Sequence, residues 1–179
     1  MLDPSVYVRL PLTSGPWAGR ADLLVWTTTP WTLVTNTLVA AHPDVEYVVA
    51  TDGTRTVVLA AALVETVLGE GWKVLDRYTG TQLERWSYQR PFELVELAGA
   101  NFVGLADYVS TEDGTGLVHT SPAYGADDYQ LGQRYDVPIV NPIGGDGRFE
   151  AGVPLVGGCL LYTSPSPRDV EESRMPSSA

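Results

Sequence analysis

Short apolar runs recur along the first 158 residues, and most of them have the length of β-strands. Residues 3–12 alternate between apolar and polar side chains, whereas residues 22–27 (DLLVWT) form the continuous apolar run typical of a buried strand. Two further strands are expected at 36–42 and 45–51. Asp52-Gly53 then predicts a tight hairpin turn into the next apolar run.

Only a few segments have the 3.6-residue spacing of helices. Residues 60–69 have this spacing and end at a glycine, and residues 125–136 have it with two acids in the first turn. The segment 79–92 is polar and ambiguous, and fits a short helix within a long loop. Further strands are expected at 72–78, 101–109, 116–122 and 137–143, the last leading into a glycine-rich hairpin. This order is not a regular βαβ alternation, so we predict an α+β fold with a curved, barrel-like sheet.

The pattern stops after Gly158, where residues rich in serine, proline and charge begin. The string CLLYTSPSPRD resembles a translated sequencing-adapter read-through, which implies that the chain from about residue 159 is not native. We therefore expect a C-terminally truncated domain at 1–158 and a disordered tail at 159–179.

Composition narrows the class of protein. With 44% hydrophobic residues the body is globular, and the only cysteine, Cys159, excludes an internal disulfide. A secretory signal and a membrane-spanning run are not visible, so a cytoplasmic protein without membrane partners is expected. The formal net charge of −11 argues against a chain that grips nucleic acid by itself, because phosphate binding needs clustered lysine and arginine.

The stretch WTTTPWTLVTN at 26–36 places three threonines between two tryptophans. The simplest interpretation is the end of an edge strand, since threonine favours strands and Pro30 removes a ladder donor. The alternative is an irregular turn whose hydroxyls and unpaired backbone groups hold a polar substrate. The run alone favours the edge strand.

A second unusual stretch, DGTGLVHTSPAYGADD at 113–128, carries His119 on an expected strand and Asp127 and Asp128 at a helix start. Taken separately, a lone histidine and two acids at a helix start are ordinary structural residues. Strand ends and helix starts are also where polar recognition sites are commonly placed. The sequence contains no serine nucleophile elbow, P-loop, dinucleotide fingerprint or metal-ligand spacing. Hydroxyls, an imidazole and a carboxylate remain, which suit binding an amine and a ribose and directing a water.

Both stretches closely resemble the paired motifs of the editing domains of class I aminoacyl-tRNA synthetases. WTTTPWTLVTNTLVAAHP is similar to their threonine-rich peptide and GTGLVHTSPAYGADDYQLGQRY to the partner motif, in the right order over roughly residues 2–157. The isoleucyl branch fits best, because valyl and leucyl relatives typically carry an arginine after two threonines and another residue at the histidine position.

The resemblance implies a role for each candidate residue. Thr27, Thr28 and Thr29 would form the hydrolytic wall that holds the terminal adenosine and the ester of a mischarged tRNA. Asp128 would hold the α-ammonium group, with Asp127 as a weaker candidate beside it. The remaining candidates would bind substrate: Trp31 shapes the pocket, Asn36 lies in the same segment, and His119 limits side-chain size.

The same resemblance implies a reaction and its partners. A binding site for isoleucine rejects valine weakly, because one methylene is worth about 1–3 kcal/mol; isoleucyl-tRNA synthetases are themselves the usual illustration. A second pocket would hydrolyse valine from the 3′ end of tRNA(Ile), with the remainder of the synthetase in cis. HIGH-like and KMSKS-like motifs are not found, so the ATP- and Mg-dependent ligation belongs to the absent synthetic domain, and this fragment needs no cofactor or metal. A non-catalytic binding fragment and a free-standing trans-editing protein are the alternatives.

Overall fold

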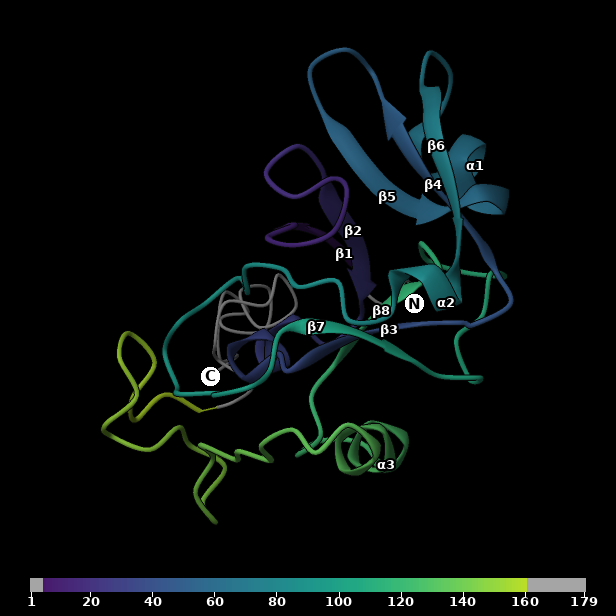
Figure 1. The fold of residues 1–179 in the computed structure, drawn as a ribbon. Coiled ribbons are helices and arrows are strands. Elements are labelled where there is room, and N and C mark those ends of the chain that lie inside the picture. Colours follow the sequence, from purple (N-terminus) through teal and green to yellow (C-terminus); the bar gives the residue numbers. More distant parts are fainter. Residues whose placement is uncertain (1–4, 161–179) are drawn as a thin grey trace.

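The structure is a computed structural model that describes residues 5–160 (Figure 1). The predicted tail therefore lies outside the described residues, except for Cys159 and Leu160, which pair with the backbone of residues 148–149. No helix of the described part is long and apolar enough to cross a membrane.

The described residues form an eight-stranded mixed sheet with a few short helices. The strand order is β6-β4-β5-β2-β8-β3-β7, with β1 paired to β2 outside this path. Figure 1 shows the sheet curling, with β4, β5 and β6 in one part and β3, β7 and β8 in the other. The strands are β1 (Val6–Pro11), β2 (Asp22–Thr27), β3 (Leu38–Ala41), β4 (Glu46–Thr51), β5 (Thr56–Ala60), β6 (Lys73–Thr79), β7 (Phe102–Leu105) and β8 (Leu117–Thr120). The predicted α+β class with a curved, half-barrel sheet is confirmed.

Helices are short, as expected from the sparse helical spacing. They are the 3₁₀ helices η1 (Pro30–Thr35) and η2 (Ala61–Leu63) and the α-helices α1 (Val64–Leu68), α2 (Gly80–Leu83) and α3 (Ala126–Arg134). The helical prediction for 60–69 corresponds to η2 and α1, ending at Gly69 with φ +76°. Helix α2 confirms the short helix expected within 79–92.

The inner strands of the sheet are buried on both faces, which explains their continuous apolar runs. Within β2, Leu23 and Val25 join one hydrophobic cluster and Leu24 another. Within β3, Val39 packs in the first cluster while Leu38 packs on the opposite face, toward α3. Since alternate side chains of a strand point to opposite faces, β2 and β3 lie inside the fold and not at its rim. The buried strand predicted at 22–27 is therefore confirmed, and the edge-strand interpretation of residues 26–31 is wrong, because β2, which ends at Thr27, pairs with β1, β5 and β8.

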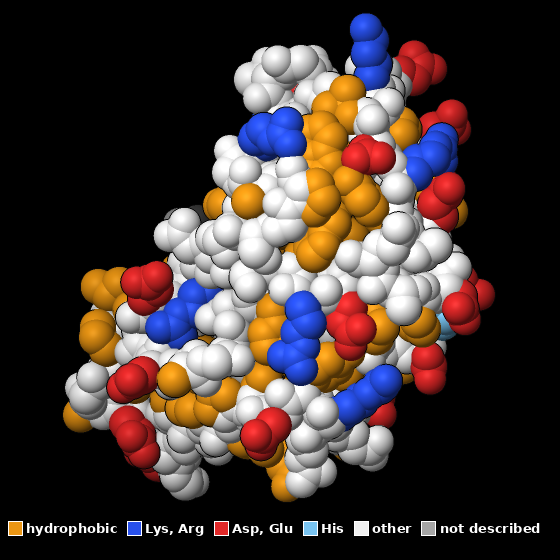
Figure 2. Space-filling model, viewed as in Figure 1, with side chains coloured by type: hydrophobic (Ala, Val, Ile, Leu, Met, Phe, Trp, Pro, Cys, Tyr) orange, Lys and Arg blue, Asp and Glu red, His pale blue; other side chains and the backbone are white. Residues whose placement is uncertain are grey.

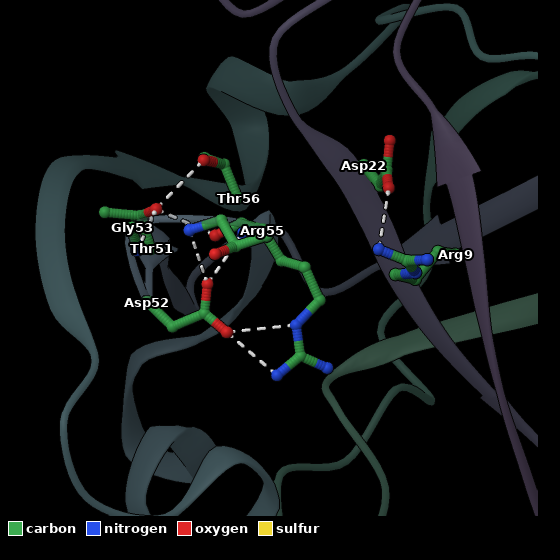
Figure 3. A network of polar contacts seen from close by, with 8 residues as sticks. Arg9, Asp22, Thr51, Asp52, Gly53, Arg55 and Thr56 are labelled. Atoms are coloured by element: carbon green, nitrogen blue, oxygen red, sulfur yellow. Dashed lines mark hydrogen bonds and ion pairs between the residues drawn. The ribbon is translucent and has the colours of Figure 1, made fainter.

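The β4–β5 hairpin is closed by its polar turn, as Asp52-Gly53 predicts. The Asp52 carboxylate accepts hydrogen bonds from the backbone N–H groups of Thr54 and Arg55 and pairs with the Arg55 guanidinium at 2.8 Å (Figure 3). Gly53 supplies the left-handed backbone, with φ +93°. The exposed pair of Arg9 and Asp22 joins β1 to β2 near by in the same view.

Two strand predictions need correction. The strand expected at 101–109 ends at Leu105, and residues 106–109 form a turn. The strand expected at 137–143 is absent: only Ile143 makes an isolated bridge, to Phe149 across the glycine-rich turn. Pro138 and Pro142 explain this, because proline lacks the N–H that a sheet ladder needs.

Candidate functional site

The threonine turn, residues 27–29, joins the end of β2 to η1. The Thr27 hydroxyl accepts the Thr29 N–H at 3.0 Å, and the Thr29 carbonyl then accepts the N–H and hydroxyl of Thr32. Pro30 stands at the start of η1, where a missing N–H costs nothing. Thr27 is buried, whereas Thr28 and Thr29 are exposed. The Thr27 hydroxyl thus stabilises the turn, and the Thr29 hydroxyl, which lies 3.4 Å from the hydroxyls of Thr27 and Thr32, still reaches the surface together with Thr28.

His119 on β8 is buried against η1, and its two ring nitrogens contact Thr32 and Asn36. Nε2 lies 2.8 Å from the Thr32 hydroxyl, and Nδ1 lies 2.7 Å from the Asn36 side-chain nitrogen. His119 is only 6% exposed, and burial lowers its pKa to about 4. The imidazole is therefore neutral at pH 7.

The neighbours of His119 also determine its tautomer. The Asn36 amide nitrogen donates to the Leu38 carbonyl, and the Asn36 oxygen accepts from the Tyr88 hydroxyl, so the orientation of the amide is fixed. That amide can only donate to Nδ1, which leaves the proton of the ring on Nε2. The Nε2–H then donates to Thr32, whose own proton goes to the Thr29 carbonyl. The chain of hydrogen bonds from Tyr88 to the threonine turn thus has one direction throughout.

Asn36 lies inside this chain and not on a surface. It is fully buried, and both its side-chain groups are occupied by protein atoms. Its geometry fits a residue that holds His119 in place. The segment is also tied to the protein by Asn101, whose side chain donates to the Asn36 carbonyl at 2.9 Å.

Asp128 approaches the same region from α3. Its carboxylate accepts the Ser121 N–H at 3.0 Å and the Tyr108 hydroxyl at 3.4 Å. The Ser121 hydroxyl lies 2.6 Å from that of Thr35, so a continuous set of contacts connects η1, the end of β8 and α3. Burial raises the pKa of Asp128, and the Ser121 N–H opposes this effect. The half-buried carboxylate is thus one for which a bound cation would compensate.

The sequence candidates do not all share direct hydrogen bonds with one another. Within the described residues, the Asp128 carboxylate accepts hydrogen bonds from Ser121 and Tyr108. Its connection to η1 is indirect and runs through Ser121 to Thr35. Asp127 lines a cavity of about 420 Å³ between α3 and the turn after β7, together with Tyr108, the partner of Asp128. Trp31 is half-buried in η1. No group of three or more histidine, cysteine, aspartate or glutamate side chains in the described range could hold a metal ion.

Comparison with known proteins gives the family. No family model matches the chain, but a Streptomyces avermitilis isoleucine–tRNA ligase is 64% identical over 163 residues, covering 90% of this chain and 16% of that protein. The isoleucine–tRNA ligase of Thermus thermophilus is 43% identical over 149 residues, covering 82% of this chain and 14% of the relative. The chain belongs to the isoleucine–tRNA ligase family.

Within this family, the chain spans about one sixth of the length of the curated relatives it matches. Solved structures give the fold of that sixth. The leucyl-tRNA synthetase structure described as GlLeuRS-CP1 matches with a TM-score of 0.58 and 20% identity, covering 76% of this chain and 66% of that one. The Plasmodium knowlesi cytosolic leucyl-tRNA synthetase editing domain matches with a TM-score of 0.57 and 12% identity, covering 73% and 62%. The segment of the ligase family described here thus has the editing-domain fold.

Sequence reasoning missed several residues of the contact network of this ligase-family segment, including Ser121, which joins Thr35 to Asp128. Thr32 and Thr35 follow Thr29 at three-residue intervals, which a 3₁₀ helix places on one side, so their spacing was a usable signal. Tyr88 and Tyr108 stand in loops, 52 and 20 residues from their partners Asn36 and Asp128. Nothing in their local sequence distinguishes them from other tyrosines.

Proposed function

We propose that this chain is the editing segment of an isoleucine–tRNA ligase and hydrolyses the ester of Val-tRNA(Ile). The observation that supports this most is the contact network between two motifs some ninety residues apart. Thr32 contacts His119 and Thr35 contacts Ser121, and Ser121 binds the Asp128 carboxylate. Hydroxyls, a neutral imidazole and a half-buried carboxylate are thereby held on three different elements.

The proposed mechanism uses positioning and needs no protein nucleophile. Asp128 binds the α-ammonium group of valine, a pairing that offsets the cost of keeping its carboxylate half-buried. The exposed Thr28 and Thr29 bind the terminal adenosine and the ester, and hold a water against the carbonyl carbon. The hydroxyls and nearby N–H groups stabilise the oxyanion as the water attacks, and the proton leaves with the ribose oxygen.

His119 serves this mechanism as a wall and not as a base. Its Nδ1 lone pair is occupied by Asn36, and its Nε2 carries the proton. A general base needs a free lone pair and a pKa near the working pH, and the pKa of His119 is about 4. We therefore assign it to limiting the size of the amino-acid side chain.

The test measures deacylation of Val-tRNA(Ile) and Ile-tRNA(Ile), with a full-length isoleucine–tRNA ligase carrying residues 5–160 of this chain in place of its own. The parent form should hydrolyse Val-tRNA(Ile) and spare Ile-tRNA(Ile). Asp128→Asn should slow deacylation of Val-tRNA(Ile) and raise its activation free energy by about 2–5 kcal/mol, because the ammonium group loses a desolvated charged partner. Asp146→Asn removes an exposed carboxylate from the hairpin at 143–149 and should change nothing.

The result also discriminates among the alternatives. If the parent form binds tRNA but hydrolyses neither ester, the segment is a binding module. If the 179-residue chain alone deacylates as fast as the chimeric ligase, a free-standing trans-editing protein is favoured over a segment acting in cis. The proposal places the reaction in the cytoplasm, with tRNA(Ile) and the rest of the ligase as partners.

A further inference from the structure

Arg90 differs from the other arginines of the described range. Its guanidinium Nη1 is buried and has no hydrogen-bond partner. Each of the seven others contacts a carboxylate, a backbone carbonyl or an aromatic ring: Arg9, Arg20, Arg55, Arg77, Arg85, Arg134 and Arg148. A buried charged donor without an acceptor is costly, and this cost would be relieved if the half-buried Arg90 side chain turned to meet an anionic partner from outside residues 5–160.

The course of the backbone directs Arg90 toward η1 and Asn36, residues 30–36. Ser87 bridges Phe102 and the Gln89 N–H bonds the Pro11 carbonyl, so the chain is extended here, and Pro91 keeps Arg90 extended as well. Alternate residues of an extended chain share a face, which places Arg90 on the side of Tyr88. The Tyr88 hydroxyl contacts Asn36 at 2.5 Å.

Residues beyond Arg90 return to the same segment. Leu94 and Val95 pack with Val34 of η1 in a small hydrophobic cluster. Arg90 is thus flanked by two attachments to residues 30–36. Burial raises the pKa of Tyr88 and the positive charge of Arg90 opposes this, which agrees with a cation close to the Tyr88–Asn36 contact.

We propose that Arg90 binds a phosphate group of the RNA strand whose 3′ end enters the threonine turn. This inference rests on the proposed function, which brings a phosphate-linked strand to that turn. The planar guanidinium presents fixed donors that match phosphate oxygens, and it stays charged when buried. In a chain of net charge −11, whose basic side chains lie apart on the face shown in Figure 2, a cation near the C-terminal end of η1 is well placed to offset repulsion of RNA.

An acidic side chain from the rest of the ligase is the competing partner. Such a carboxylate would satisfy the same guanidinium. If it were the partner, replacing Arg90 would not change how tRNA binding depends on salt. A contact to phosphate releases a counterion from the RNA. Loss of one such contact therefore reduces the slope of log K against log salt concentration by about 1. The two partners are therefore separable by one measurement.

The experiment uses the full-length ligase carrying residues 5–160 and compares Arg90→Gln, Arg90→Lys and the control Arg77→Gln. Arg77, on edge strand β6, forms an exposed ion pair with Glu46 of β4. Binding of uncharged tRNA(Ile) is measured at several salt concentrations, together with the concentration dependence of Val-tRNA(Ile) deacylation and the melting temperature. Arg90→Gln should weaken binding about tenfold and reduce the slope of log K against log salt by about 1. Its maximal deacylation rate should change less than the half-saturating concentration.

Arg90→Lys should keep the slope and lose part of the affinity, and Arg77→Gln should match the parent. Unchanged affinity and slope in Arg90→Gln would overturn the proposal. So would a lower melting temperature with an unchanged slope, which would assign Arg90 to a protein carboxylate. Uncharged tRNA needs no hydrolysis to bind, so an inactive parent form would count against the editing function and leave the Arg90 test valid.

Discussion

At the residue scale, the hydrogen bonds of His119 are unfavourable for general acid–base catalysis. Its ring is closed in by partners on both nitrogens, and its proton is held on the nitrogen that faces Thr32. The imidazole is therefore a rigid, neutral, flat group of known orientation. A side chain of this kind is suited to setting the dimensions of a pocket.

Shortening His119 should consequently change selectivity before it changes rate. In the chimeric ligase, His119→Ala should begin to hydrolyse Ile-tRNA(Ile) while still accepting Val-tRNA(Ile). It should also lose about 1–3 kcal/mol of stability, because Thr32 and Asn36 are left with unpaired groups. His42→Ala, at the other histidine, is the control for the deacylation of both tRNAs. Loss of Val-tRNA(Ile) hydrolysis without any action on Ile-tRNA(Ile) would instead support a general base.

The two motifs lie where strands end or begin, and one of these junctions, at the start of β8, requires a glycine. Gly116 precedes β8 with φ +76°, and a Cβ there would lie 2.6 Å from the Ala60 Cβ of β5. Gly53 in the β4–β5 turn has a similar left-handed backbone, φ +93°, but open space around it. An alanine at Gly53 would suffer backbone strain alone, whereas an alanine at Gly116 would suffer backbone strain and steric overlap with Ala60.

Gly116→Ala should therefore destabilise the protein more than Gly53→Ala. Backbone strain costs about 1–2 kcal/mol at either site, and overpacking adds roughly 1–3 kcal/mol at Gly116. Urea unfolding of the two variants and the parent measures the difference. Equal losses would mean that β5 and β8 adjust to the added methyl group.

The strand positions followed from the sequence where burial, local spacing and turn chemistry agreed. The run 22–27, the Asp52-Gly53 turn and the helix around 125–136 were predictable because each signal is local. The strand expected at 137–143 failed because its apolar residues are separated by prolines. Likewise, the two motifs were found by resemblance, whereas Tyr88 and Arg90 were missed, because their partners are fixed by tertiary folding.

At the scale of the whole molecule, the buried histidine should make stability depend on pH. The pKa of His119 is about 4 in the folded protein and 6.5 in an unfolded chain, so the unfolded state binds more protons between these values. Its contribution is complete above pH 6.5 and declines as the pH falls toward 4, by up to about 3 kcal/mol.

The measurement compares the free energy of unfolding of the parent with that of His119→Gln at several pH values. The glutamine variant should lose stability less steeply between pH 6.5 and 4. Taking the difference between the two proteins removes the opposite contribution of Asp128, whose raised pKa favours the folded state as the pH falls. Parallel curves would show that His119 titrates alike in both states.

The central position of β8 has a consequence for how the chain acquires its structure. β8 is the last described strand in sequence, yet it lies between β2 and β3, pairing Trp26 with Val118 and Val39 with His119. Without β8, the strands on either side would belong to two separate sheets with open edges, and joining them requires contacts across some ninety residues. In pulsed hydrogen exchange during refolding, the β8 amides should gain protection in the slowest phase, well after the β4–β5 hairpin; simultaneous protection would contradict this order. Because His119 arrives with β8, Thr32 and Asn36 obtain their imidazole partner only when the sheet closes, so the fold and the proposed site are completed by a single late event.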